Sequence, residues 1–522
     1  MFKLKIPTVV SAVVFFVSSI AAGNAKYVVV VVWDGLRPEL LTKENAPVLY
    51  DLAQKGVVFD NYHATFPATS ETNAVALATG SYPRTSGLLA NREYRPTLDA
   101  SKPVQTQSLT SVRIGDSLTS DKYLKAPTIA EVLRSQKPAL RTVCVGTKDA
   151  TVLVDRAIRD GDSPSIIVSE GDALPISFAE RLNADLGVFP SVTNKNKTVR
   201  DNWTTTALVE EAWADSVPPF SLLWLGEPEY SQRQTGIGSP DSVAAIGNCD
   251  AKLATILHTL DQRGILAETD IFVVSACGFT SCSHKVDLMD DLLAAKINAY
   301  KSITGATPTD SVLTCSQGSC NFIYITGSDK GVKDSVLAAL FKLDYVGAIF
   351  TKDGARGTFK LSDAMLDCDG APDIVAAFRW SSEKNEFGVP GSQPCEIGSA
   401  KAMHSGLSPY DMRGTMVAVG PDFKGGSKDD LPAGNTDIAP TVYWIFGTPT
   451  PATVEGRVLS EAMTIPAPEI KSHTSNRLEA SVDTPKGKRW QYLKVSEVNG
   501  VRYIEEGDGG IVRGDAQAKS GK

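Results

Sequence analysis

An uninterrupted apolar run near the N-terminus, from Val28 to Trp33, ends at an acidic residue, Asp34. Six residues rich in valine, with no polar interruption, are typical of a strand at the centre of a parallel sheet that is covered on both faces. Ligands of open α/β sheets bind beyond the carboxyl ends of such strands, so Asp34 is a candidate metal or phosphate-site residue. A plain turn is the alternative, because Asp34-Gly35 is also common turn chemistry.

A second polar segment, Thr69 to Asn73, opens an apolar helix pattern that ends near Gly80. Thr69 or Ser70 is expected to cap this helix by accepting hydrogen bonds from its first amides. A hydroxyl at that place also lies at the positive end of the helix, where an anion or a developing alkoxide is favoured. Ser70 is therefore a candidate nucleophile as well as a candidate cap.

Apolar strand patterns and helical patterns alternate along the chain, which predicts an α/β fold with a mostly parallel central sheet and helices on both faces. The chain is long enough for one such domain or for two or three ordinary ones, and the regular alternation favours one domain over residues 26–465. Further strands are expected at residues 142–145, 221–225, 271–275, 322–326 and 415–419, and helices at 127–134, 241–262 and 335–342. Residues 466–522 form a polar tail, in which Asn499-Gly500 predicts a β-hairpin appendage outside the site.

Residues 1–25 have the features of a cleaved signal peptide: Lys3 and Lys5, an apolar run, and small residues that end at Ala25. No comparable run follows, so we expect a secreted or periplasmic protein without a membrane anchor in the mature chain. Cleavage removes two lysines and takes the net charge from −8 to −10. An acidic chain with no basic tract argues against duplex nucleic acid or an anionic membrane as the main partner.

Eight cysteines fit an exported protein in an oxidising compartment. The expected disulfides are Cys315–Cys320 first, then Cys277–Cys282 and Cys368–Cys395. For Cys277, pairing with Cys282 or Cys249 is preferred over a role as a metal ligand.

Five segments together resemble one known family. They read WDGLRP from Trp33, SETN followed by ALATGSYPRTSGLLAN, LLWLGEPEYSQ, VVSACGF and MHSGLSPYDMRGTMVAVGPDF. Their order and spacing are similar to those of the type I phosphodiesterase and nucleotide pyrophosphatase family of the alkaline phosphatase superfamily, from Tyr27 to about Thr450. The resemblance implies an alkaline-phosphatase-like fold, two zinc ions, and hydrolysis of phosphodiester or pyrophosphate bonds through a zinc-activated Ser or Thr. A small phosphorylated ligand or a nucleotide is the implied partner.

Several family positions carry suitable residues. The resemblance places the first acidic metal ligand on Asp34, the nucleophile on Ser70, the phosphate-binding Asn on Asn91 and a late His ligand on His404. Ser70 and Asn91 are thus the implied catalytic residues, and Asn91 would also bind substrate.

Four other family positions have changed. The family sequence E-P-D-x-x-G/Q-H is Glu-Pro-Glu229 ending at Arg233, and S-D-H-G is Ser-Ala276-Cys277-Gly. Glu229 and a reduced Cys277 are suitable zinc ligands, but Ala276 offers no ligand atom and Arg233 is a permanent cation. We therefore expect one zinc ion or none, and Arg233 is expected either to pair with Glu229 or to bind an anionic substrate.

Three functions remain open from the sequence. The first is an exported phosphodiesterase-like protein with lost or weakened hydrolysis. The second is an active phosphoric ester hydrolase with a remodelled site, in which one zinc is bound by Asp34, Ser70 and Cys277. The third is an extracellular binding protein for a phosphorylated ligand, held by Arg233 and Asn91. His63 is close enough in sequence to Ser70 to be considered as a base, whereas Cys277, Cys282 and His284 form only a weak zinc-site pattern.

Overall fold

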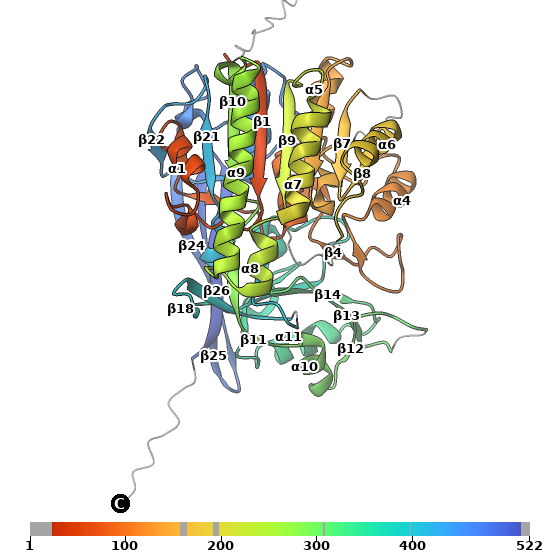
Figure 1. Cartoon of the computed structure of the whole chain (residues 1–522). Helices are drawn as coiled ribbons and strands as arrows, with labels where there is room; N and C mark the ends of the chain where they lie inside the picture. Colours follow the sequence, from red (N-terminus) through yellow and green to blue (C-terminus); the bar gives the residue numbers. More distant parts are fainter. Residues whose placement is uncertain (1–22, 157–163, 192–197, 306–307, 397, 513–522) are drawn as a thin grey trace, which may run out of the picture.

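The structure is a computed structural model that describes residues 23–156, 164–191, 198–305, 308–396 and 398–512. The predicted signal peptide therefore lies almost entirely outside the described residues. A nine-stranded sheet forms the centre of the molecule, and its strands follow one another in the order β22-β2-β21-β10-β1-β9-β6-β7-β8 (Figure 1). In that order they span Ser427–Asp429, Val57–Phe59, Met416–Val419, Thr269–Val274, Tyr27–Trp33, Phe220–Leu225, Thr142–Gly146, Ile166–Ser169 and Asp172–Leu174.

The central sheet is mostly parallel, as predicted. β1 pairs in parallel with β10 and β9, and β6 pairs in parallel with β9 and β7, whereas β21 runs antiparallel to β10. Residues Val28 to Trp33 of β1 are fully buried and alternate between two apolar clusters, one on each face of the sheet. This double coverage explains why the strand has no polar residue before Asp34.

Helices cover both faces of the central sheet. The long helix α9 runs along the strands and packs with α1 on one face (Figure 1), while α2, α5 and α13 contribute to the cluster on the other. The α-helices are α1 (Pro47–Ala53), α2 (Ser70–Thr79), α3 (Pro83–Ser86), α4 (Leu109–Thr119), α5 (Ile129–Gln136), α6 (Ile176–Asp185), α7 (Thr198–Thr206), α8 (Glu229–Thr235), α9 (Pro240–Gln262), α10 (Leu288–Ala294), α11 (Val332–Leu340), α12 (Pro409–Met412) and α13 (Ile438–Ile445). No helix in the described part of the chain is long and apolar enough to cross a bilayer.

Smaller sheets surround one end of the central sheet. A six-stranded sheet has the order β12-β13-β14-β17-β15-β16, a four-stranded sheet the order β18-β19-β11-β20, and two short pairs are β23-β3 and β4-β5. The strand expected at residues 322–326 is β14, and it belongs to the six-stranded sheet rather than to the central one. The bounds are β12 (Asn298–Tyr300), β13 (Ser311–Ser316), β14 (Cys320–Ile325), β15 (Val346–Thr351), β16 (Phe359–Lys360), β17 (Ile374–Phe378), β18 (Ser381–Lys384), β19 (Pro390–Cys395), β11 (Thr280–Lys285), β20 (Ala402–Met403), β23 (Ala433–Gly434), β3 (Tyr62–His63), β4 (Arg92–Glu93) and β5 (Val104–Gln105).

The C-terminal region is a three-stranded antiparallel sheet. The predicted hairpin at Asn499-Gly500 joins β25 (Gly487–Val498) to β26 (Val501–Val512), and β24 (His473–Thr484) adds a third strand that the sequence did not predict. Leu493, Val495 and Ile504 are buried in an apolar cluster with residues of the main domain. The sheet is thus anchored to the body of the protein.

One disulfide, Cys282–Cys395, is formed among the described residues, and the three expected pairs are wrong. β11 and β19 are neighbours in the four-stranded sheet, which brings together two cysteines that are 113 residues apart. Cys315 instead lies opposite Phe322 in the β13–β14 pair, so it does not face Cys320. Cys277 has a free, buried thiol.

Candidate functional site

Asp34 and Ser70 meet at the carboxyl end of β1. Thr69 caps α2 by accepting a hydrogen bond from the amide of Thr72, and this leaves the Ser70 hydroxyl free for another partner. That hydroxyl donates to Oδ2 of Asp34 at 2.9 Å, and the indole of Trp224 donates to the same oxygen at 3.2 Å. Asp34 and Ser70 are both fully buried.

A residue that sequence reasoning missed, Lys148, lies at the centre of this site. Its ammonium nitrogen is 2.8 Å from Oδ2 of Asp34 and 2.9 Å from Oγ of Ser70, and it also forms an ion pair with Glu229. Burial alone would lower the pKa of Lys148, but the charges of Asp34 and Glu229 raise that pKa well above its ordinary value. The two carboxylates therefore favour the charged form of Lys148.

One signal could have revealed Lys148 in the sequence. It lies two residues beyond β6, at the same edge of the sheet as Asp34, where the carboxyl ends of parallel strands meet. The sequence predicts the strand but not the role of the lysine that follows it.

A second cation lies beside the first. Arg233, one turn after Glu229 on α8, forms an ion pair with that carboxylate and lies 3.3 Å from Nε2 of His404. His404 Nε2 is 3.5 Å from Oε1 of Glu229. Burial acts to raise the pKa of Glu229, but Lys148 and Arg233 together hold that pKa well below its ordinary value. Of the two roles expected for Arg233, the ion pair with Glu229 is present in the structure.

The charges in this group of residues balance. Two carboxylates, Asp34 and Glu229, are matched by two cations, Lys148 and Arg233. Glu71 adjoins Ser70, and burial followed by the charge of Asp149 raises the pKa of Glu71 to about 8, so its carboxyl group is mostly neutral at pH 7.

Cys277 does not take part in the ion-pair group. Its side chain is buried in the apolar cluster that contains Phe66 and Leu407, and burial together with the charges of Asp34 and Glu229 raises the pKa of the thiol well above its ordinary value. The neighbouring Ala276 contributes only its backbone carbonyl, which accepts a hydrogen bond from Asn435.

Asn91 lies outside the ion-pair group. Its backbone carbonyl accepts a hydrogen bond from the amide of Thr106, and α2 is tied to the same loop by the Thr72 hydroxyl, which donates to the Leu89 carbonyl. Oδ1 of Asn91 is buried without a hydrogen-bond partner among the described residues. An unpaired buried acceptor of this kind is a candidate ligand contact.

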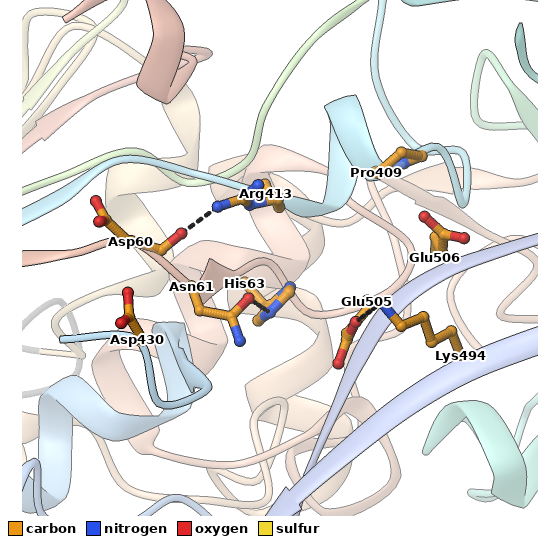
Figure 2. A pocket seen from close by; sticks show the side chains of 9 residues that line it. All are labelled: Asp60, Asn61, His63, Pro409, Arg413, Asp430, Lys494, Glu505 and Glu506. Carbon is orange, nitrogen blue, oxygen red and sulfur yellow. Dashed lines mark hydrogen bonds and ion pairs between the residues drawn. The ribbon is translucent and has the colours of Figure 1, made fainter. Parts of the chain in front are cut away.

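His63 belongs to a different place on the molecule. Figure 2 shows its ring beside Asn61, whose Oδ1 is 2.8 Å from Nε2, in a surface cavity of about 350 Å³ that is also lined by Asp60, Arg413 and Glu505. Burial lowers the pKa of His63 to about 4. No contact between His63 and Ser70 is found within the described residues, so the structure does not support His63 as the base.

A larger cavity, of about 640 Å³, is lined by residues that neighbour Lys148 and Thr106 in the sequence, and not by the ion-pair group itself. One wall contains Gln105 and Gln107, which flank Thr106, the partner of Asn91. Another wall begins at Asp149, the residue after Lys148, in the short 3-10 helix η2 (Asp149–Leu153). Cavities of this size hold small organic ligands.

The fold and the motif positions define a phosphodiesterase-like protein of the alkaline phosphatase superfamily. The chain belongs to the type I phosphodiesterase / nucleotide pyrophosphatase family, which it matches over residues 28–383. Its fold is similar to that of murine ectonucleotide pyrophosphatase/phosphodiesterase 5, solved alone and as an inactive variant in complex with AMP, each with a TM-score of 0.60 and 16% identity. The human protein of the same name gives a TM-score of 0.58 at 14% identity.

Each of these comparisons covers 84% of this chain and all of the other. No curated protein matches the sequence.

The side chains present do not fit the two zinc ions that the family resemblance implies. Zinc requires three or four close nitrogen, sulfur or oxygen ligands. Here Oδ2 of Asp34, Oγ of Ser70 and Oε2 of Glu229 already surround the ammonium group of Lys148, and a metal ion at these three oxygens would be repelled by it. Across the described ranges, no group of three or more His, Cys, Asp or Glu side chains is placed to hold a metal ion.

Proposed function

We propose that this protein is an exported member of the phosphodiesterase family that has lost two-zinc hydrolysis and keeps the fold for binding. The observation that carries the proposal is the ammonium nitrogen of Lys148, which lies between Asp34, Ser70 and Glu229. In this site a side-chain cation supplies the positive charge that a metal ion would supply in the family. Arg233 does the same beside Glu229 and His404.

Ser70 is poorly placed to act as a nucleophile. A serine hydroxyl needs a base or a metal ion to attack a phosphorus centre. Lys148 is held in its charged form and cannot accept the proton, and the Ser70 side chain is fully buried. An incoming phosphodiester would have to displace the Lys148 ion pairs before it could reach the hydroxyl.

The active one-metal alternative has less support. It requires Cys277 as a zinc ligand, whereas that side chain is buried in an apolar cluster. Its zinc would also have to replace Lys148 at the Asp34 oxygen.

Export rests on two features. The sequence of residues 1–25 has the pattern of a signal peptide, and the Cys282–Cys395 disulfide suits an oxidising compartment.

A phosphorylated small molecule, such as a nucleotide, is the ligand class that the site favours. The 640 Å³ cavity is lined by Asp149, which follows Lys148, and by Gln105, which pairs with Arg92 beside Asn91. Oδ1 of Asn91 is buried without a partner among the described residues. Arg233 keeps 28% of its side chain exposed, so it has room for a further anionic partner. The murine neighbour was solved with AMP, which makes AMP a natural first probe.

Hydrolysis is tested with bis-p-nitrophenyl phosphate, zinc and the purified mature protein, with Ser70→Ala as the matched control. The proposal expects the same background rate from both proteins, with or without a chelator. Zinc-dependent turnover that disappears in Ser70→Ala would establish the active alternative instead.

Ligand binding is tested separately by the thermal shift that AMP produces. Ala179→Trp, on the cavity side of α6, is expected to abolish the shift, and Glu180→Trp, on the exposed side of the same helix, is expected to preserve it. A shift that survives Ala179→Trp, or no shift in the native protein, would rule out binding of AMP in this cavity.

A further inference from the structure

The outer strand of the C-terminal sheet presents a long open edge. β24 has 12 residues, pairs with β25 on one side, and has no strand paired to its other side within the described part of the chain. Most of its side chains are exposed. Unpaired backbone groups along such an edge are ready to pair with another strand.

The sequence of β24 is complementary to itself when it is read in the opposite direction about Leu478. In that register, Arg477 lies opposite Glu479 of a second copy, and Glu479 lies opposite Arg477. The flanking pair is Asn476 with Ala480, which carries no charge. Directly opposite side chains of unlike charge stabilise antiparallel strands, whereas like charges destabilise them.

We infer that two copies of this protein pair through their β24 edges, antiparallel and with a two-fold axis at Leu478, so that two three-stranded sheets become one of six strands. A two-fold interface requires one surface to be complementary to itself, and the Arg477–Glu479 pattern meets this requirement. Charged residues on an edge strand normally discourage pairing with other chains. This arrangement discourages strands that lack the matching charges and accepts a second copy.

Arg477 and Glu479 are accessible to a second copy of the protein. In the single chain they bond to each other at 2.8 Å, with 50% and 69% of their side chains exposed. The ring of Tyr492 lies beneath the Arg477 guanidinium, which holds the arginine on the outer face of the sheet.

The paired length is short. At the far end of β24, the chain at Gly357 in η6 (Ala355–Gly357) lies against the carbonyl of Ser481 and covers that part of the strand. By symmetry the pairing then runs from Asn476 to Ala480 of each copy. Such a small interface gives a weak dimer, so the dimeric fraction is expected to increase as the protein concentration rises.

Charge reversal tests the register directly by sedimentation velocity over a concentration series. Arg477→Glu places Glu opposite Glu twice, and Glu479→Arg places Arg opposite Arg twice, so each variant alone is expected to weaken the dimer about tenfold. An equimolar mixture of the two variants restores both attractive pairs and is expected to form a heterodimer. Lys330→Glu, a charge reversal on an exposed loop outside the sheet, should leave the dimer unchanged.

Three results would overturn the inference. They are a native protein that stays monomeric at every concentration, a dimer that neither reversal weakens, and a mixture that associates no better than the separate variants.

Discussion

The ammonium nitrogen of Lys148 lies 2.8 Å from Oδ2 of Asp34, a residue 114 positions earlier in the chain. The same nitrogen bonds to Ser70 and Glu229, so one side chain ties β1, α2 and α8 to the segment that follows β6. A side chain therefore carries the positive charge at this site.

Replacing Lys148 with Met removes the positive charge and keeps most of the volume of the side chain. The carboxylates of Asp34 and Glu229 are then buried with one cation fewer, so the free energy of unfolding is expected to fall by about 3–5 kcal/mol. Urea unfolding measures the change. Adding Asp34→Asn removes one of the uncompensated charges and should recover part of the loss, and a double variant no more stable than Lys148→Met would contradict this explanation.

Arg233→Met provides a matched comparison on the same carboxylate. Glu229 keeps Lys148 as a partner, and the side chain of Arg233 is 28% exposed, so water screens part of the interaction. We expect a loss of about 1–2 kcal/mol, smaller than that of Lys148→Met. Equal losses of unfolding free energy in the two variants would contradict this expectation and show that Lys148 and Arg233 stabilise the folded protein equally.

Asp429, which lies outside the ion-pair group, is expected to make the folding stability depend on pH. Burial, followed by the charge of Glu461, raises the pKa of Asp429 to about 7. The folded state therefore keeps a proton that the unfolded state releases near pH 4, and stability from this group falls as the pH rises towards 7, by at most about 1.4 kcal/mol per pH unit.

Asp429→Asn imitates the protonated carboxyl group and should remove this fall. The variant is expected to gain stability relative to the native protein between pH 5 and pH 8, as measured by thermal unfolding. A difference that stays constant over that range would mean that Asp429 is ionised in the folded protein.

The Cys282–Cys395 pairing makes a prediction that the sequence alone did not. Because the bond closes a loop of 113 residues, Cys395→Ser is expected to lower the free energy of unfolding by about 2–4 kcal/mol. Cys368→Ser, at a free cysteine, should change it by less than about 1 kcal/mol. The opposite order of effects would restore Cys368 as a disulfide partner.

Local patterns in the sequence predicted much of the fold. The valine run of β1, the helix that begins at Ser70 and the turn at Asn499-Gly500 each have a signal within a few residues, because burial on both faces, helix capping and hairpin geometry are local properties. The motifs also placed Asp34, Ser70, Glu229 and His404 at one site.

Contacts between distant segments could not be predicted in the same way. The position of Lys148 just beyond a predicted strand is a local signal, but its contacts with Asp34 and Ser70 depend on β6 and β9 being neighbours in the sheet, and no local pattern gives that strand order. The disulfide prediction was wrong for the same reason. Short sequence spacing favoured Cys315 with Cys320, but the pairing of β11 with β19 brings Cys282 to Cys395.

The zinc content of the purified mature protein, measured by elemental mass spectrometry after dialysis against trace zinc, tests the central claim most directly. If Lys148 and Arg233 have taken the place of the metal ions, the protein will carry well below one zinc ion per chain. A content close to two ions per chain would contradict this account, because the Asp34 and Glu229 oxygens would then have to bind metal in place of the two side-chain cations.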